Sequence, residues 1–308
     1  SKTGLHTPEE MNEISFMESE VKLIAENADI IGSLKIPKHC KECPVVLLIA
    51  GSGPTDRNGN NTIGLNTNCY KMISDTLVSN GIASLRFDKR GIAASYSEDF
   101  NESDITIEDY VNDVIGWIGQ LKADARFSKT YVLGHSEGVL IGSLAANKTN
   151  VDGFIAVAGT SQRADSLILE QLAIQPAPLR LEANKIVQSL QQGVQVPHVS
   201  LELYSLFRPS IQPYLISWFK YTPKTEISKV ASPVFILHGA TDLQVKSEEA
   251  LELGERSQNV EITIIENMNH VLKNSSSNLE ENLATYSDPS LPLSDKFCEV
   301  LVEFLTKN

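Results

Sequence analysis

The stretch VLGHSEGVLIG places Ser136 between two glycines in the pattern G-x-S-x-G. An apolar run typical of a strand precedes the pattern, and small apolar residues typical of a helix follow it. A serine on a sharp strand-to-helix turn is the setting of an activated nucleophile, because flanking glycines relieve crowding around the turn. The pattern alone is weak evidence, since both residue types are common. Whether Ser136 is a nucleophile therefore depends on whether partner residues for it are found elsewhere in the chain.

A serine hydroxyl becomes a good nucleophile only when a base takes its proton. Among the six histidines, His270 directly follows the last predicted strand, VEITIIEN. Asp242 follows the preceding predicted strand, where a carboxylate would orient the imidazole and stabilise its cation. For His238, at the end of that same strand, we expect a core or supporting role. The sequence therefore predicts a catalytic triad of Ser136, Asp242 and His270, in that chain order.

Hydrophobic patterns indicate which elements position these residues. Two alternating segments, 21–25 and 30–37, predict an antiparallel hairpin. Beyond it, predicted strands alternate with predicted helices. The strands are at residues 44–51, 82–88, 130–134, 154–159, 232–239 and 260–267, and the helices between them include 69–81, 105–122 and 137–147. This alternation predicts an α/β fold, a doubly wound and mostly parallel sheet with antiparallel N-terminal strands. Ligands of such sheets bind beyond the carboxyl ends of the strands, where the three candidates stand.

One segment, residues 162–227, interrupts the alternation. It contains Leu-rich helical pieces, several prolines and the aromatic run PYLISWFKYTP, and it is too long for a plain connection. We expect a helical lid inserted into a core made of residues 1–161 and 228–308. Trp218, Phe219 and Tyr221 are candidates for an apolar acyl or aryl pocket, with packing of the lid as the alternative. A second irregular stretch, 273–292, is rich in Ser, Asn and Pro and predicts a long surface loop.

Composition excludes some functions. The formal net charge of −13 argues against a nucleic-acid partner, because phosphate binding needs clustered Lys and Arg. The longest apolar run, 45–50, is too short to span a bilayer, and the N-terminus shows no signal-peptide pattern. We expect a soluble protein whose compartment stays open: it is either cytoplasmic or, since the chain begins with Ser1, exported with its leader already removed.

Four cysteines are too few for a disulfide scaffold at this length. Cys40 and Cys43 have the spacing of a metal or redox pair. No second ligand pair follows, and the pair leads into a strand rather than a helix, so neither function is favoured and their role stays open. Cys298 lies on an apolar helical face and is expected in the core.

These motifs together resemble the alpha/beta-hydrolase superfamily over nearly the whole chain. GHSEG matches its nucleophile elbow, GATDLQV its acid loop and NMNH its histidine loop. RFDKRGIAAS is similar to its D-x-R-G-x-G-x-S segment, with Ala94 interpreted as replacing a glycine. AGSGPTDRNGN resembles a group of lidded esterases related to serine aminopeptidases and prolyl-oligopeptidase-type enzymes.

The resemblance and the elbow chemistry together predict an oxyanion hole. One donor is the backbone N–H of Glu137, the residue after the nucleophile, and the other is that of Ser52, with Gly53 as the neighbouring alternative. Asp56 and Arg57 are candidates for the substrate pocket, with turn capping and surface pairing as alternatives.

The leading hypothesis is a serine hydrolase that cleaves carboxylic esters of small or medium size through an acyl-enzyme on Ser136. It requires no metal or organic cofactor, and its expected partner is a small-molecule ester. An aminopeptidase or amidase, or an acyltransferase, would use the same triad. A non-enzymatic binding protein with this fold is disfavoured, because such proteins often lose a triad member.

Overall fold

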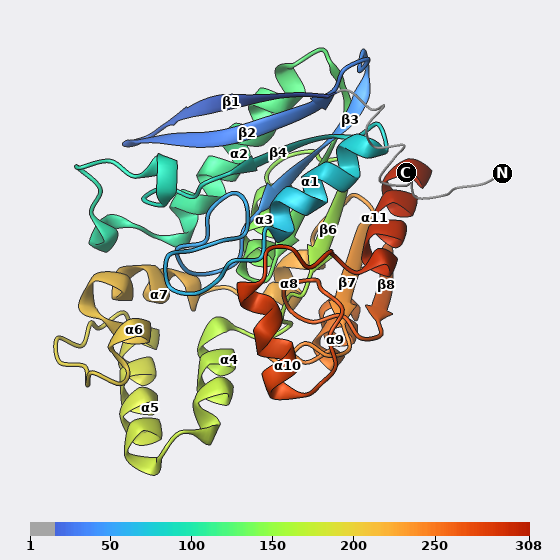
Figure 1. Ribbon diagram of the computed structural model, residues 1–308. Helices are drawn as coiled ribbons and strands as arrows, with labels where there is room; N and C mark the ends of the chain where they lie inside the picture. Colours follow the sequence, from blue (N-terminus) through green and yellow to red (C-terminus); the bar gives the residue numbers. More distant parts are fainter. Residues whose placement is uncertain (1–15) are drawn as a thin grey trace.

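The computed structural model describes residues 16–308, which form one eight-stranded sheet flanked by helices (Figure 1). The strand order is β1-β2-β4-β3-β5-β6-β7-β8. The pairs β1–β2 and β2–β4 are antiparallel, and all others are parallel. The strands are β1 (Phe16–Ala25), β2 (Ala28–Pro37), β3 (Cys43–Ile49), β4 (Ala83–Phe87), β5 (Phe127–His135), β6 (Gly153–Val157), β7 (Val234–Gly239) and β8 (Val260–Ile265). The predicted α/β fold, with its antiparallel start, is confirmed.

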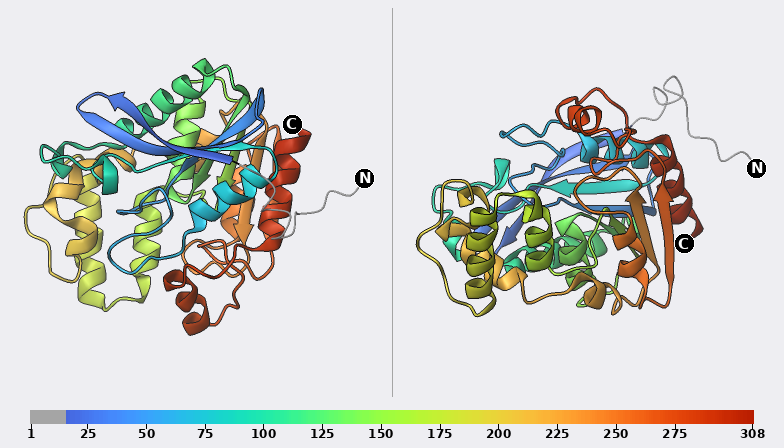
Figure 2. Two further views of the ribbon diagram at one scale, coloured as in Figure 1. Left: turned by 45° about the horizontal axis from the view of Figure 1, so that its top comes forward. Right: turned by 90° about the horizontal axis from the view of Figure 1, so that it is seen from below.

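Helices cover both faces of the sheet (Figure 2), which explains why the central strands are continuous apolar runs. One apolar cluster packs the sheet against α2 (Ile107–Ala123), α3 (Glu137–Ala146) and α9 (Glu248–Gly254). The other packs it against α1 (Cys69–Ser79) and α11 (Asp295–Lys307). A capping box begins α2, where the backbone N–H of Thr106 donates to the Asp109 carboxylate at 2.8 Å. No helix in residues 16–308 has the length and apolar character needed to cross a membrane.

Residues 162–227 form helices and no strand. They are α4 (Ala164–Gln171), α5 (Ala177–Gln191), α6 (Tyr204–Phe207), α7 (Gln212–Trp218) and α8 (Pro223–Ile227), with short 3-10 turns between them. In Figure 1, α4, α5 and α6 stand apart from the sheet. Residues 162–227 have an apolar cluster of their own, which includes Ile186, Phe207 and Phe219. The division of the chain into core and lid stays a prediction.

The stretch 273–292 is not the plain surface loop that its composition predicts. It contains α10 (Leu279–Ala284), whose N-terminus is capped by the side chain of Asn278. Asn282 is fully buried, and its amide donates to the backbone carbonyls of Thr241 and Ser276 at 2.8 and 2.9 Å. The polar residues of this segment therefore cap a helix and bind loop carbonyls, which composition alone does not reveal.

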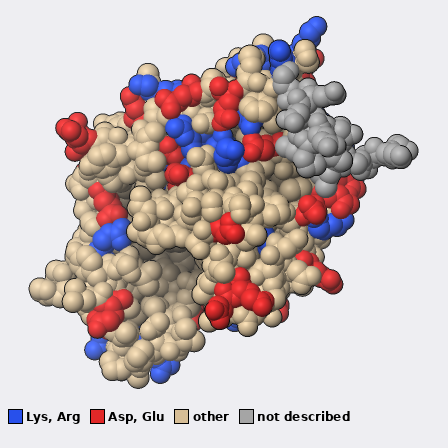
Figure 3. Space-filling view, in the orientation of Figure 1, with Lys and Arg blue, Asp and Glu red and all other residues tan. Residues whose placement is uncertain are grey.

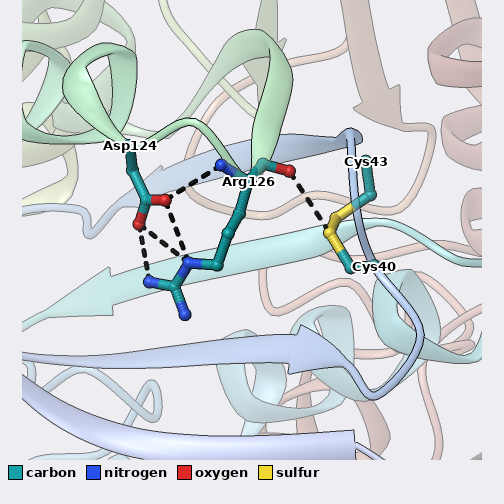
Figure 4. The surroundings of a disulfide bond; sticks show 4 residues. All are labelled: Cys40, Cys43, Asp124 and Arg126. Atoms are coloured by element: carbon teal, nitrogen blue, oxygen red, sulfur yellow. Dashed lines mark hydrogen bonds and ion pairs between the residues drawn. A yellow bond between two sulfur atoms is a disulfide. The ribbon is translucent and has the colours of Figure 1, made fainter.

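Cys40 and Cys43 form a disulfide, with their Cα atoms 5.3 Å apart, at the N-terminal end of β3 (Figure 4). The N–H of Cys43 donates to the carbonyl of Arg126 at 3.1 Å, and Arg126 pairs with Asp124. Because the two thiols are bonded to each other, neither is a thiolate ligand for a metal. The predicted core position of Cys298 is confirmed.

Candidate active site

Ser136 lies on a sharp turn between β5 and α3, with a φ of +55° and a ψ of −118°. Its backbone N–H donates to the carbonyl of Val157 at 2.9 Å. A Cβ atom on Gly134 would lie 2.2 Å from the carbonyl oxygen of Gly138, and one on Gly138 would lie 2.5 Å from that of Ile49. Only glycine fits these two positions, so the G-x-S-x-G pattern is what allows the turn.

His270 and Asp242 are in direct contact, with 2.7 Å between Nδ1 and Oδ2. The other carboxylate oxygen accepts the backbone N–H groups of Gln244 and Val245 at 2.8 and 3.0 Å. Burial alone would raise the pKa of Asp242, but the nearby His270 and His238 lower it below its usual value. Asp242 is therefore an ionised group suited to orient His270.

Ser136 and His270 line the same cavity, of about 220 Å³. Ser136 follows β5, Asp242 follows β7 and His270 follows β8, so three strand ends bring them together. The same serine also lines a larger cavity of about 530 Å³. The arrangement fits a nucleophile with its base on one side and a substrate cavity on the other.

His135, next to the serine, is buried and bridges two loops. Its Nε2 lies 2.8 Å from the carbonyl of His270, which can only accept, so Nε2 carries the proton and Nδ1 accepts from the hydroxyl of Tyr70 at 2.8 Å. That hydroxyl also accepts the N–H of Gly51 at 3.0 Å. Burial lowers the pKa of His135 to about 3, with His270 contributing. The neutral ring thus links the loop after β3 to the histidine loop.

The predicted oxyanion donors stand beside Ser136. Glu137 is the first residue of α3, where backbone N–H groups have no partner within the helix. Ser52 and Gly53 follow β3, and both line the larger cavity together with Ser136 and Glu137. Gly53 has a φ of +78°, a conformation that favours glycine. These positions suit amides that bind a developing oxyanion at the serine.

Several known proteins are similar to this chain in sequence or in structure. The model of the serine aminopeptidase (S33) family matches residues 63–210. The esterase EstD of Thermotoga maritima is 27% identical over 286 residues, which are 88% of this chain and 64% of that protein, so the chain spans less than two thirds of the relative's length. Est1E from Butyrivibrio proteoclasticus, solved with ferulic acid, superposes with a TM-score of 0.63 at 18% identity, over 93% of this chain and 96% of its own. The Pyrococcus furiosus esterase Pf2001 gives 0.61 at 16% identity, over 99% and 96%.

The chain has the alpha/beta-hydrolase fold, and about half of it is similar to the serine aminopeptidase (S33) family. Its D-x-R-G-x-G-x-S segment requires one correction. The alanine at the second glycine position is Ala93, not Ala94, and Ala93 has the positive φ, +45°, that a glycine would adopt easily. The loop is held by Asp88, whose backbone carbonyl accepts from the hydroxyl of Ser95 at 2.7 Å.

A buried charged network beside Ser136 was missed at the sequence level. The carboxylate of Glu137 accepts from Lys89 Nζ at 3.0 Å and from the hydroxyl of Tyr214 at 2.6 Å. The side chains of Lys89 and Glu137 are each only 3% exposed. Lys89 is the variable residue of the D-x-R-G segment, so the motif gave no reason to select it.

The larger cavity is mostly apolar, and Figure 3 shows a hollow between the helices of residues 162–227 and the body, with few charged atoms in it. Its apolar lining includes Val139, Leu140, Leu167, Ile168, Leu206, Ile211, Leu215 and Trp218. Trp218 is therefore placed where the sequence predicted a pocket.

The other four residues predicted for the substrate pocket line neither cavity, so for them the prediction is wrong. Asp56 caps a turn, accepting the N–H groups of Asn58 and Asn60 at 2.7 and 3.0 Å. Arg57 pairs with Asp88 and Glu20. Phe219 is 4% exposed and packs within the helical segment, and the hydroxyl of Tyr221 donates to Glu108 at 2.9 Å. Turn capping, ion pairing and packing are therefore the alternatives that hold for these residues.

Proposed function

We propose that this hydrolase is a serine carboxylesterase that cleaves carboxylic esters of small or medium size. The observation that carries the proposal is the 2.7 Å contact between His270 and Asp242, with His270 and Ser136 lining one cavity. A histidine oriented by a carboxylate and placed beside an elbow serine is the arrangement that activates a hydroxyl nucleophile.

In the proposed mechanism, His270 accepts the proton of Ser136 as its oxygen attacks the ester carbonyl carbon. The backbone amides of Glu137 and of Ser52, or Gly53 beside it, stabilise the resulting oxyanion, and each such donor contributes about 100- to 1000-fold in rate. His270 then gives the proton to the departing alcohol, leaving an acyl-enzyme. His270 takes a proton from the water that attacks the acyl carbon, and it returns that proton to the oxygen of Ser136 as the acid leaves.

The charges in the cavities favour esters over substrates with a free amine. An aminopeptidase needs an unpaired carboxylate to bind the amine. Among residues 16–308, Glu137 is the one acidic residue that lines the larger cavity, and its carboxylate is paired with Lys89 and Tyr214. In the neighbouring cavity, Glu102 is paired with Arg208 at 2.8 Å. Among the described residues that line these cavities, no carboxylate is free to hold an ammonium group.

We also propose that residues 162–227 act as a lid over the acyl-binding cavity of a core made of residues 1–161 and 228–308. Tyr214, Leu215 and Trp218, all on α7, line the 530 Å³ cavity together with Ser136. An apolar acyl or aryl group would be enclosed between these residues and the sheet.

The proposal is tested with a panel of p-nitrophenyl esters of rising acyl length against aminoacyl p-nitroanilides. We expect kcat/KM for esters to exceed that for every anilide by at least about 100-fold, and Ser136→Ala to abolish the ester activity. Comparable turnover of an anilide would favour the peptidase alternative. If added alcohol diverts most of the product into a new ester, the acyltransferase alternative holds instead.

A further inference from the structure

We propose that Lys89 is a positioning residue that holds the two halves of the oxyanion hole together. The inference rests on the proposed function, because it assigns a role in stabilising the oxyanion formed at Ser136. Lys89 itself is two residues beyond the C-terminal end of β4, and its ammonium group donates to Gly51 and Glu137.

Two buried contacts of one ammonium group carry the proposal. Lys89 Nζ donates to the backbone carbonyl of Gly51 at 2.7 Å and to the carboxylate of Glu137 at 3.0 Å. Gly51 directly precedes Ser52, whose amide is one proposed donor, and Glu137 supplies the other. A single side chain therefore fixes both peptide segments whose N–H groups must converge on one oxygen. How well the two N–H groups converge decides how much the oxyanion hole stabilises the transition state, because its donors must be preorganised.

The network also controls charge at the site. An unpaired carboxylate on the residue after the nucleophile would oppose the negative charge that develops on the substrate oxygen. The ammonium of Lys89 compensates Glu137, and the ring of Tyr110 lies over it, with Nζ 5.1 Å from the ring centroid. Because the pair is buried, loss of either partner leaves an uncompensated charge.

The same carboxylate links the site to the proposed lid. Its second oxygen accepts from the hydroxyl of Tyr214 on α7 at 2.6 Å. Burial, followed by the charge of Glu137, raises the pKa of Tyr214, so the phenol stays a protonated donor. Lys89 thus stands at the junction of the loop after β3, the start of α3 and the helical segment.

The test separates positioning from simple charge pairing by comparing Lys89→Met with the double variant Lys89→Met/Glu137→Gln. The double variant has no unpaired buried charge, so we expect its urea midpoint to return toward that of the wild type. It still lacks the contact with the Gly51 carbonyl. We therefore expect kcat to stay at least about tenfold reduced with KM within about threefold of the wild type. The affinity for an aryl trifluoromethyl ketone, which forms an oxyanion adduct on the serine, should fall by the same factor as kcat/KM.

The matched control is Lys22→Met, which removes an exposed lysine paired with exposed Asp29 at 2.8 Å and should leave all these values unchanged. A double variant with restored stability and wild-type kcat would overturn the proposal, since Lys89 would then only neutralise Glu137. That outcome differs from a failure of the proposed function, in which the wild type itself would hydrolyse no ester or would not need Ser136.

Discussion

His135 shows how one buried side chain couples protonation to stability. In the unfolded chain a histidine titrates near pH 6.5, whereas burial in the native state lowers the pKa of His135 to about 3. Between these values the unfolded state binds a proton that the native state does not. The free energy of unfolding therefore falls as the pH falls from 6.5 toward 3.

We predict that this residue makes the free energy of unfolding fall by about 1 kcal/mol between pH 6 and pH 5. His135→Gln cannot titrate, so its urea-derived free energy should change less across that interval, whatever its absolute stability. The measurement is the difference between the two proteins in the slope of the free energy of unfolding against pH. Parallel slopes would mean that His135 is protonated in the folded protein.

At the scale of single residues, the sequence identifies functional side chains that follow predicted strands, and few others. Ser136, Asp242 and His270 could be selected because each directly follows a predicted strand. Lys89 could not, because its partners Gly51 and Glu137 come from two other loops that only the folded chain brings together. Contacts between single residues of different loops leave no periodic pattern in the sequence.

At the scale of elements, the elbow depends on close approach between β3, β5 and α3. Gly138 faces the end of β3, where an added Cβ atom would lie 2.5 Å from the carbonyl oxygen of Ile49 and 2.9 Å from that of Ala50. Backbone atoms cannot rotate away as a side chain can, so α3 would have to shift.

We predict that Gly138→Ala destabilises the protein by about 1–3 kcal/mol and lowers kcat at least tenfold, because the shift displaces the amide of Glu137. The matched control is Gly119→Ala on the exposed face of α2, where no atom beyond the neighbouring helix backbone lies within 4 Å of the added Cβ. That change should stabilise the helix by up to about 1 kcal/mol with no effect on kcat. Urea unfolding and ester kinetics check both, and equal behaviour of the two variants would contradict this account of the elbow.

The predictability of elements follows from burial. Strands buried on both faces, such as β6 and β7, are continuous apolar runs and are readily predicted. The stretch 273–292 is not, because its polar side chains are satisfied by capping α10 and by binding loop carbonyls. The same composition is typical of an exposed loop.

At the scale of the whole molecule, the sheet topology assembles the candidate site from segments far apart in the chain. The strand order places β3 next to β5, and β6, β7 and β8 follow in sequence, so the loops that carry Ser52, Ser136, Asp242 and His270 open at the same edge. The alternation of strands and helices was sufficient to predict this edge. Among the side chains of residues 162–227 that face the cavity, the sequence predicted only Trp218, because the others depend on how helices without a sheet partner pack.

The central claim is that Ser136 is a nucleophile activated by His270, and covalent labelling tests it most directly. A fluorophosphonate probe is incubated with the wild type and with His270→Ala, and the labelled peptide is mapped by mass spectrometry. We predict modification at Ser136 in the wild type and a labelling rate at least about 1000-fold lower in His270→Ala. Label on another residue, or labelling of Ser136 at an unchanged rate without His270, would contradict the account.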